Sequence, residues 1–202
     1  LGSFSSAIFL FGLAFVWGIT GTTNIADVAG YMGQVAAGTI PMSPGLGLAL
    51  AFMTTGVAFK IAAVPFHYWT PDAYQGSPTP VTGYLSVGPK IGAFALIIRL
   101  FAEGLADLAI DWNIVFMVLA ALTMTLGNLV ALQQDNVKRM LAYSSIAHTG
   151  YMLVGFAAYG AGNIAGMEAL LFYGAAYAVM NLGAFGVVAA LQRRTGVTSN
   201  LS

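Results

Sequence analysis

Two lysines of this sequence lie within segments that are otherwise apolar, where an ammonium group could exchange protons. Lys60 follows the uncharged run 45–59, and Lys90 lies near the middle of the apolar run that Pro80 opens and Arg99 closes. A lysine at the centre of a membrane span costs roughly 2.5–3.5 kcal/mol on insertion scales, so its side chain must face a partner or a hydrated interior. Lysine suits proton exchange because it can lose its proton when buried, whereas arginine stays charged.

Each lysine also has a purely structural interpretation. Lys90 could be paired permanently with a carboxylate, and Lys60, in the inward half of its span, could extend its amine to the membrane surface. Pro65 stands five residues after Lys60 and should break the helix, because proline lacks a backbone donor. Broken helices at membrane depth recur at ion and substrate sites of transporters. We therefore expect Lys60 and Lys90 to be functional.

The proline-rich connection between the two lysines carries His67, Trp69, Asp72 and Tyr74. These side chains could line a polar path in which His67 exchanges protons, because an imidazole titrates near neutral pH. The connection could equally be an interfacial loop with an aromatic belt, in which Asp72 caps a short helix. The sequence favours the second interpretation for Trp69 and Tyr74 and leaves His67 open.

A second polar set lies later in the chain. Ser144, His148 and Tyr151 follow i, i+4, i+7 spacing and share one helix face. His148 could pass protons sideways from Lys90 through Ser144, Tyr151 and water, or it could hydrogen-bond a neighbouring helix. Two further polar stripes are typical of helix packing. They comprise Tyr173, Tyr177 and Asn181, and Thr123, Thr125 and Asn128.

The composition is that of an integral membrane protein. Only 7% of the 202 residues are charged, 58% are hydrophobic, and the mean hydropathy is +0.82. Seven basic and seven acidic residues cancel, which argues against nucleic acid as a partner. The absence of cysteine excludes disulfides, thiolate metal sites and Fe–S clusters on this chain. No metal-ligand set, catalytic triad or phosphate loop can be assembled, so catalysis by this chain alone is not expected.

The elements that must position these residues are transmembrane helices, because a bilayer core about 30 Å thick needs about 20 apolar helical residues. The sequence predicts an all-α fold with a short interfacial helix over 26–37 and a break near Pro65. Six segments meet the length test. They are 3–20, 45–64, 79–102, 112–133, 137–159 and 166–192.

Strict alternation of six spans divides the charges between the two sides of the membrane. One side holds Lys138, Arg139, Arg193, Arg194, Asp72 and Asp135, and the other holds Asp27, Glu103, Asp107, Asp111 and Glu168, with Arg99 in the adjoining turn. The positive-inside rule makes the first side cytoplasmic or its organellar equivalent. In this interpretation Lys138 and Arg139 determine topology and do not form a site. We expect residues 1–202 to be a single transmembrane domain without a signal peptide, and a fragment of a longer protein.

Two long motifs resemble one known family. FKIAAVPFHYWTPDAYQGSPTPV (59–81) is followed by Lys90 and IIRLF (97–101), and then by QQDNVKRMLAYSSIAHTGYMLVGF (133–156). In this order they resemble the antiporter-like membrane subunits of respiratory complex I, and most closely the subunit N family. The resemblance covers almost the whole chain, which would correspond to the sixth to eleventh helices of that family.

The resemblance implies roles for three residues and for neighbouring subunits. Lys60 matches the lysine of the discontinuous seventh helix, which pairs with a glutamate of the fifth; Lys90 matches the central lysine of the eighth, and His148 falls in the tenth-helix motif. The glutamate, a sixth-helix lysine and a twelfth-helix lysine would lie outside these 202 residues. Lys60, Lys90 and His148 would relay protons, with His67, Asp72, Ser144 and Tyr151 in support.

The same resemblance implies where the redox chemistry takes place and which partners the chain has. NADH, FMN, Fe–S clusters and quinone are expected on other subunits and no cofactor on this chain. The expected partners are other membrane-arm subunits, lipid, protons and internal water. The expected location is the bacterial inner membrane, with an organellar membrane left open.

Two other functions remain open from the sequence. A subunit of a multisubunit sodium/proton antiporter shares the discontinuous helix and both lysines. A non-conducting scaffold is the third possibility, and it would tolerate methionine in place of Lys60 and Lys90.

Overall fold

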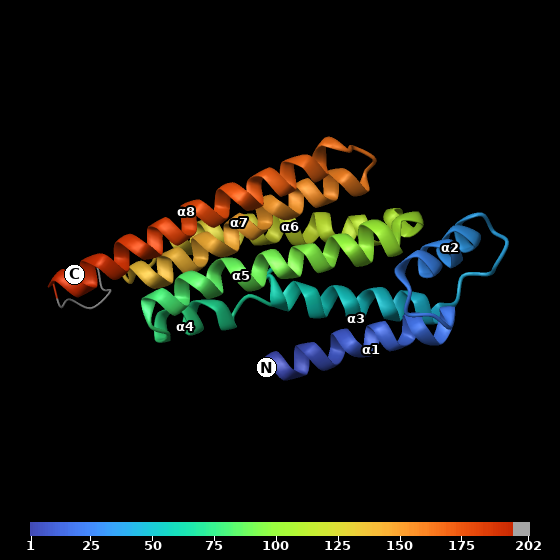
Figure 1. Ribbon diagram of the computed structural model, residues 1–202, viewed down its shortest axis with the longest axis horizontal. Helices are drawn as coiled ribbons and strands as arrows, with labels where there is room; N and C mark the ends of the chain where they lie inside the picture. The colour runs from blue at the N-terminus through green and yellow to red at the C-terminus, as the bar shows by residue number, and fades with distance from the viewer. Residues whose placement is uncertain (196–202) are drawn as a thin grey trace.

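The chain is an elongated bundle of roughly parallel helices (Figure 1). The computed structural model describes residues 1–195, apart from the side chains of residues 110, 111 and 195. Within that range every regular element is helical, as predicted. The α-helices are α1 (Gly2–Thr20), α2 (Ile25–Ala36), α3 (Pro44–Lys60), α4 (Trp69–Gly76), α5 (Thr79–Ile97), α6 (Ala109–Ala131), α7 (Val137–Gly160) and α8 (Ala165–Thr195). A π-helix (Ile98–Gly104) and a 3-10 helix (Ala106–Leu108) join α5 to α6.

Each of the six predicted spans contains one α-helix in the described part of the chain, but these helices differ in length and polarity. Within residues 1–195, four helices are long and apolar enough to cross a membrane: α1, α5 with its π-helical extension, α6 and α8. The helix α3 has only 17 residues, and α7 has 24 residues but contains the polar side chains of the second set. Successive long helices run in opposite directions, and α2 and α4 lie at opposite ends of the bundle (Figure 1).

The predicted break is present, but α3 ends earlier than the sequence suggested. The expected segment runs to residue 64, whereas α3 stops at Lys60. The carbonyl of Ile61 would accept from the amide of residue 65 in a continuing helix, and Pro65 has no N–H to donate. The helix therefore ends one turn before the proline. Ala62 turns the chain with a φ of 59°, and the Val64–Pro65 peptide bond is cis.

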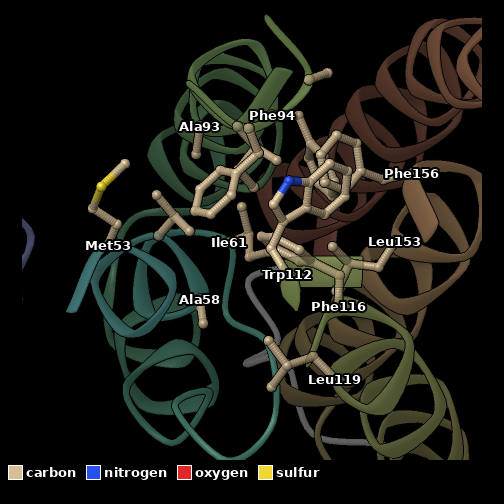
Figure 2. Packing of buried hydrophobic residues seen from close by; sticks show 14 of the residues in the cluster. Met53, Ala58, Ile61, Ala93, Phe94, Trp112, Phe116, Leu119, Leu153 and Phe156 are labelled. Atoms are coloured by element: carbon tan, nitrogen blue, oxygen red, sulfur yellow. The ribbon is translucent and has the colours of Figure 1, made fainter. Parts of the chain in front are cut away.

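An aromatic core joins α6 and α7 to the two helices that carry the lysines. Trp112 stacks on Phe156 with ring centroids 5.0 Å apart, and Phe116 meets Phe156 edge-on at 5.0 Å. The Trp112 indole N–H donates to the carbonyl of Leu105 at 2.9 Å. Figure 2 shows this cluster against Ile61 and against side chains of α3 and α5. The core thus fixes the break of α3 relative to α5 and α7.

Two glycines allow α6 and α7 to pack with their backbones close together. A Cβ on Gly150 would lie 2.5 Å from the amide nitrogen of Met124, and one on Gly127 would lie 2.7 Å from that of Ala147. Lipid gives helices no hydrophobic drive to associate, so small residues at the contact provide the packing. This contact sets how α7 is rotated about its axis, and therefore the direction in which the second polar set points.

Candidate functional site

Lys90 lies inside the bundle with only 2% of its surface exposed. Its ammonium nitrogen is 2.7 Å from the carbonyl oxygen of Ser145, 2.6 Å from the Ser145 hydroxyl and 3.0 Å from the Thr149 hydroxyl. Three acceptors therefore match the three protons of the ammonium, and all three are neutral. Among the described side chains, the ion pairs are Arg99 with Glu103 and Arg139 with Asp72, so the alternative of a permanent Lys90–carboxylate pair finds no partner there.

A buried polar network extends from Ser145 to α8. The Ser145 hydroxyl lies 2.7 Å from the Tyr177 hydroxyl, which donates to the Ser86 carbonyl at 2.8 Å. The Asn181 amide donates to the Ser86 hydroxyl at 2.6 Å and to Tyr177 at 3.2 Å. These four side chains are at most 3% exposed. The stripe of Tyr177 and Asn181, which the sequence assigned to packing, is thus hydrogen-bonded to the residues that hold Lys90.

Two prolines each free a helix carbonyl, and a hydroxyl from another helix occupies each one. Pro65 removes the helical donor to Ile61, and the Thr149 hydroxyl donates to that carbonyl at 3.1 Å. Pro89 lies inside α5, directly before Lys90, and removes the donor to Leu85. The Tyr74 hydroxyl of α4 donates to the Leu85 carbonyl at 3.3 Å. Freed backbone groups at membrane depth persist where such side chains satisfy them.

His148 lies beside this network on α7 and faces a cluster of tyrosines. Its Nδ1 is 2.6 Å from the Tyr173 hydroxyl, and its ring centroid is 5.4 Å from that of Tyr177 and 5.6 Å from that of Tyr151. The Tyr151 hydroxyl accepts from Asn128 at 2.7 Å. The Lys90 ammonium bonds to Ser145 and Thr149, which precede and follow His148 along α7, and not to the imidazole. A water would have to complete a path between them.

Lys60 and His67 flank the break and do not contact Lys90. Lys60 is the last residue of α3, and its side chain is exposed on this chain. A cation is favourable at a helix C-terminus, where the carbonyl dipoles are unpaired. His67 is half-buried with its ring edge-on to Tyr143 at 6.3 Å. Among the described residues, neither His67 Nδ1 nor the Thr70 hydroxyl has a hydrogen-bond partner, although both atoms are buried.

The remaining predicted site residues lie apart from the ammonium. Asp72 is at the surface and pairs with Arg139 at 2.5 Å, and Ser144 is half-buried on α7 next to the serine that bonds Lys90. Sequence reasoning did not select Ser145 or Thr149. The available signal was their i, i+4 spacing, which places two hydroxyls on one face of a helix.

Lys138 holds α4 in place and is not simply a topology signal. Its side chain is buried, and the ammonium donates to the carbonyls of Gln75, at 2.9 Å, and Ser77. Arg139 reaches the Gln75 side-chain oxygen at 3.1 Å in addition to Asp72. These contacts dock the second half of the broken helix on α7.

The groups gathered around Lys90 can accept and donate protons, and they include no set of metal ligands. The sequence contains no cysteine. Where side chains are described, no three His, Asp or Glu residues gather to hold a metal ion. The chemistry available at this site is that of a lysine, an imidazole and hydroxyl groups.

Comparison with known proteins gives consistent results along the whole chain. Residues 1–202 match the family described as NADH:quinone oxidoreductase/Mrp antiporter, transmembrane. NADH-quinone oxidoreductase subunit N of Trichlorobacter lovleyi is 49% identical over 188 residues, covering 93% of this chain and 37% of that protein.

Solved structures show the same fold. A chain of respiratory complex I from Thermus thermophilus with bound aureothin is 35% identical, with a TM-score of 0.72, covering 96% of this chain and 42% of that one. A chain of the Mrp complex from Dietzia sp. is 27% identical, with a TM-score of 0.81, covering 95% of this chain and 34% of that one. The chain therefore spans well under half the length of the relatives it matches.

Proposed function

Because the chain belongs to the NADH:quinone oxidoreductase/Mrp antiporter transmembrane family, we propose that it is part of a proton-translocating membrane-arm subunit of an NADH:quinone oxidoreductase. The relatives named as quinone oxidoreductase subunits support this choice, since they are more similar to it in sequence than the Mrp chain is. The redox groups and the NADH and quinone sites lie on other subunits. The location is the bacterial inner membrane, and the partners are neighbouring membrane-arm subunits.

Lys90 is the residue that takes up and releases the transported proton. A change of charge near the exposed Lys60 alters the field at the break, and a nearby charge is worth several kcal/mol at low dielectric constant. That change drives the proton from Lys90 through water towards His148 and Tyr173. A carboxylate on a helix outside residues 1–202 is the expected partner of Lys60.

The single observation that carries this proposal is the environment of Lys90. A 2%-exposed ammonium with three neutral acceptors is a costly arrangement for a purely structural residue, because no described carboxylate compensates its charge. It suits a group that alternates between charged and neutral forms.

The test is Lys90→Ala in the full-length subunit, assembled in its complex and reconstituted in vesicles. We expect assembly to be intact while proton pumping and coupled turnover fall. Arg99→Ala is the matched control, because the side chain of Arg99 is 61% exposed and lies beyond Lys90 on the same helical segment. Wild-type proton stoichiometry in Lys90→Ala would contradict the relay.

A sodium/proton antiporter subunit is the second candidate, and the fold match to the Mrp complex favours it. If this chain is an antiporter subunit, Lys60 and Lys90 would serve ion exchange without a redox arm. Co-purification of the full-length subunit with a peripheral redox arm supports the oxidoreductase, whereas sodium-dependent proton exchange without such an arm supports the antiporter.

A further inference from the structure

The Thr149 hydroxyl lies between Lys90 and the backbone of the break that follows Lys60. It is 3.0 Å from the Lys90 ammonium and 3.1 Å from the Ile61 carbonyl, and Thr149 is fully buried. We propose that Thr149 couples the protonation state of Lys90 to the backbone of the broken helix. This inference rests on the proposed function, because it concerns the proton that Lys90 exchanges.

The direction of the hydrogen bond between Lys90 and Thr149 is fixed while Lys90 is an ammonium. An ammonium has three donors and no acceptor, so Thr149 must accept from it. The single hydroxyl proton of Thr149 then points to a carbonyl, either that of Ile61 or that of Ser145, both at 3.1 Å. The Ser145 carbonyl also accepts from Lys90, at 2.7 Å. The Ile61 carbonyl has no helical donor, because the residue four positions later is Pro65, which lacks an N–H. A hydrogen bond from Thr149 therefore stabilises this carbonyl more than it stabilises that of Ser145.

Loss of a proton from Lys90 reverses one of these bonds. A neutral amine donates two hydrogen bonds and accepts one. The two contacts to Ser145, at 2.7 and 2.6 Å, are shorter than the contact to Thr149, so the amine keeps donating to Ser145. Thr149 must then turn its proton to the Lys90 nitrogen. The Ile61 carbonyl loses its donor as a consequence.

The Ile61 carbonyl that loses its donor lies at the C-terminal end of α3, where the helix breaks. Ile61 follows Lys60 directly, and the next residue, Ala62, turns the chain with a φ of 59°. An unpaired buried carbonyl is unfavourable, so the segment 61–66 opens more readily or admits water. The neutral form of Lys90 thereby loosens the break beside Lys60, and the charged form closes it.

A second threonine provides a matched control. Thr123 is also fully buried, and its hydroxyl accepts from the amide of Val64 at 2.9 Å. It therefore holds the same break but does not contact Lys90. Thr149→Val removes the coupling hydroxyl with little change of shape, Thr149→Ser keeps it, and Thr123→Val loosens the break without touching the lysine.

The experiment measures amide hydrogen exchange of the segment 61–66 in the full-length subunit within its complex, at several pH values and corrected for intrinsic exchange. In the wild type and in Thr149→Ser we expect exchange to rise about two- to tenfold as Lys90 becomes neutral with rising pH, the factor that one net hydrogen bond gives. Thr149→Val exchanges fast and Lys90→Met slowly at every pH. Thr123→Val raises exchange throughout but keeps the pH-dependent step.

Other titratable groups lie on the helices around Lys90, and the variants separate their effects. These groups are His148 on α7, Tyr173 and Tyr177 on α8 and Tyr74 on α4, while Lys60 and His67 flank the break itself. A step that persists in Lys90→Met comes from one of them and overturns the proposal. A step that persists in Thr149→Val overturns it as well.

Proton pumping distinguishes this inference from the proposed function. Wild-type pumping in Lys90→Met would refute the proposed function. Loss of pumping in Lys90→Met together with wild-type pumping in Thr149→Val would refute the coupling alone. We expect Thr149→Val to lower the proton-to-electron ratio and Thr149→Ser to restore it.

Discussion

The buried lysine at the start of α7 should determine whether α4 stays docked. Lys138 is only 5% exposed, and it supplies two hydrogen bonds to carbonyls at the C-terminal end of α4, where a helix has no internal donors. Hydrogen bonds to a charged group are worth about 1.5–3 kcal/mol each. Lys138→Met should therefore ease local opening of α4 by about 3 kcal/mol or more, which corresponds to about hundredfold faster amide exchange.

The neighbouring arginine is the control for charge and position. Arg139 and Asp72 are 33% and 73% exposed in their side chains, and such surface pairs contribute about 0–1 kcal/mol. Arg139→Gln should accelerate exchange of α4 by about fivefold at most. The assay is hydrogen exchange with mass spectrometry on the full-length subunit in its complex. Equal effects of the two substitutions, or unchanged exchange in Lys138→Met, would refute the assignment of Lys138 to α4.

Two further predictions concern the site and its support. Ser145→Ala removes one of three acceptors of the Lys90 ammonium, and one charged hydrogen bond is worth about 1.5–3 kcal/mol, so this variant should lower coupled pumping about tenfold or more. Ser144→Ala should leave pumping within about twofold of the wild type. Equal losses in the two variants would contradict the assignment of Ser145 as the serine that binds Lys90. Gly150→Val should lower the melting temperature of the subunit, because its Cβ would lie 2.5 Å from the Met124 nitrogen. Gly183→Ala, with nothing within 4 Å of its Cβ, should leave the melting temperature unchanged or raise it, because alanine is favoured over glycine in a helix interior by up to about 1 kcal/mol.

The helices were predictable because they depend on local patterns. The interfacial helix expected over 26–37 is α2, and Asn24 caps it by accepting from the amide of Ala26. The fifth predicted span, 137–159, matches α7 to within a residue. Hydrophobic length and turn residues carry these signals within a short window of sequence.

The hydrogen-bond network was not predictable in the same way. The bonds that hold Lys90 join residues 55 and 59 positions apart, and the one between Thr149 and Ile61 spans 88 positions. Which of two adjacent serines reaches the lysine depends on how α7 is rotated against α5, and packing sets that rotation. A neglected local signal was Pro89, directly before Lys90, which frees a carbonyl within the helix.

Proline also explains why α3 ends before the predicted bound. The sequence predicts a break near Pro65 and a span that runs to residue 64, but the cost of a proline falls on the carbonyl four residues earlier. The helix ends at Lys60 in consequence, and the lysine becomes the C-terminal residue of a half-helix. That placement leaves its side chain exposed on this chain.

The most direct test of the account is Lys90→Arg in the full-length subunit, assembled and reconstituted in vesicles. Arginine keeps the positive charge and can donate to Ser145 and Thr149, but it does not release a proton. The measured quantity is the number of protons pumped per electron transferred. The account predicts a loss like that of Lys90→Ala in an assembled complex, whereas a wild-type ratio with arginine at this position would contradict the claim that Lys90 itself exchanges the proton.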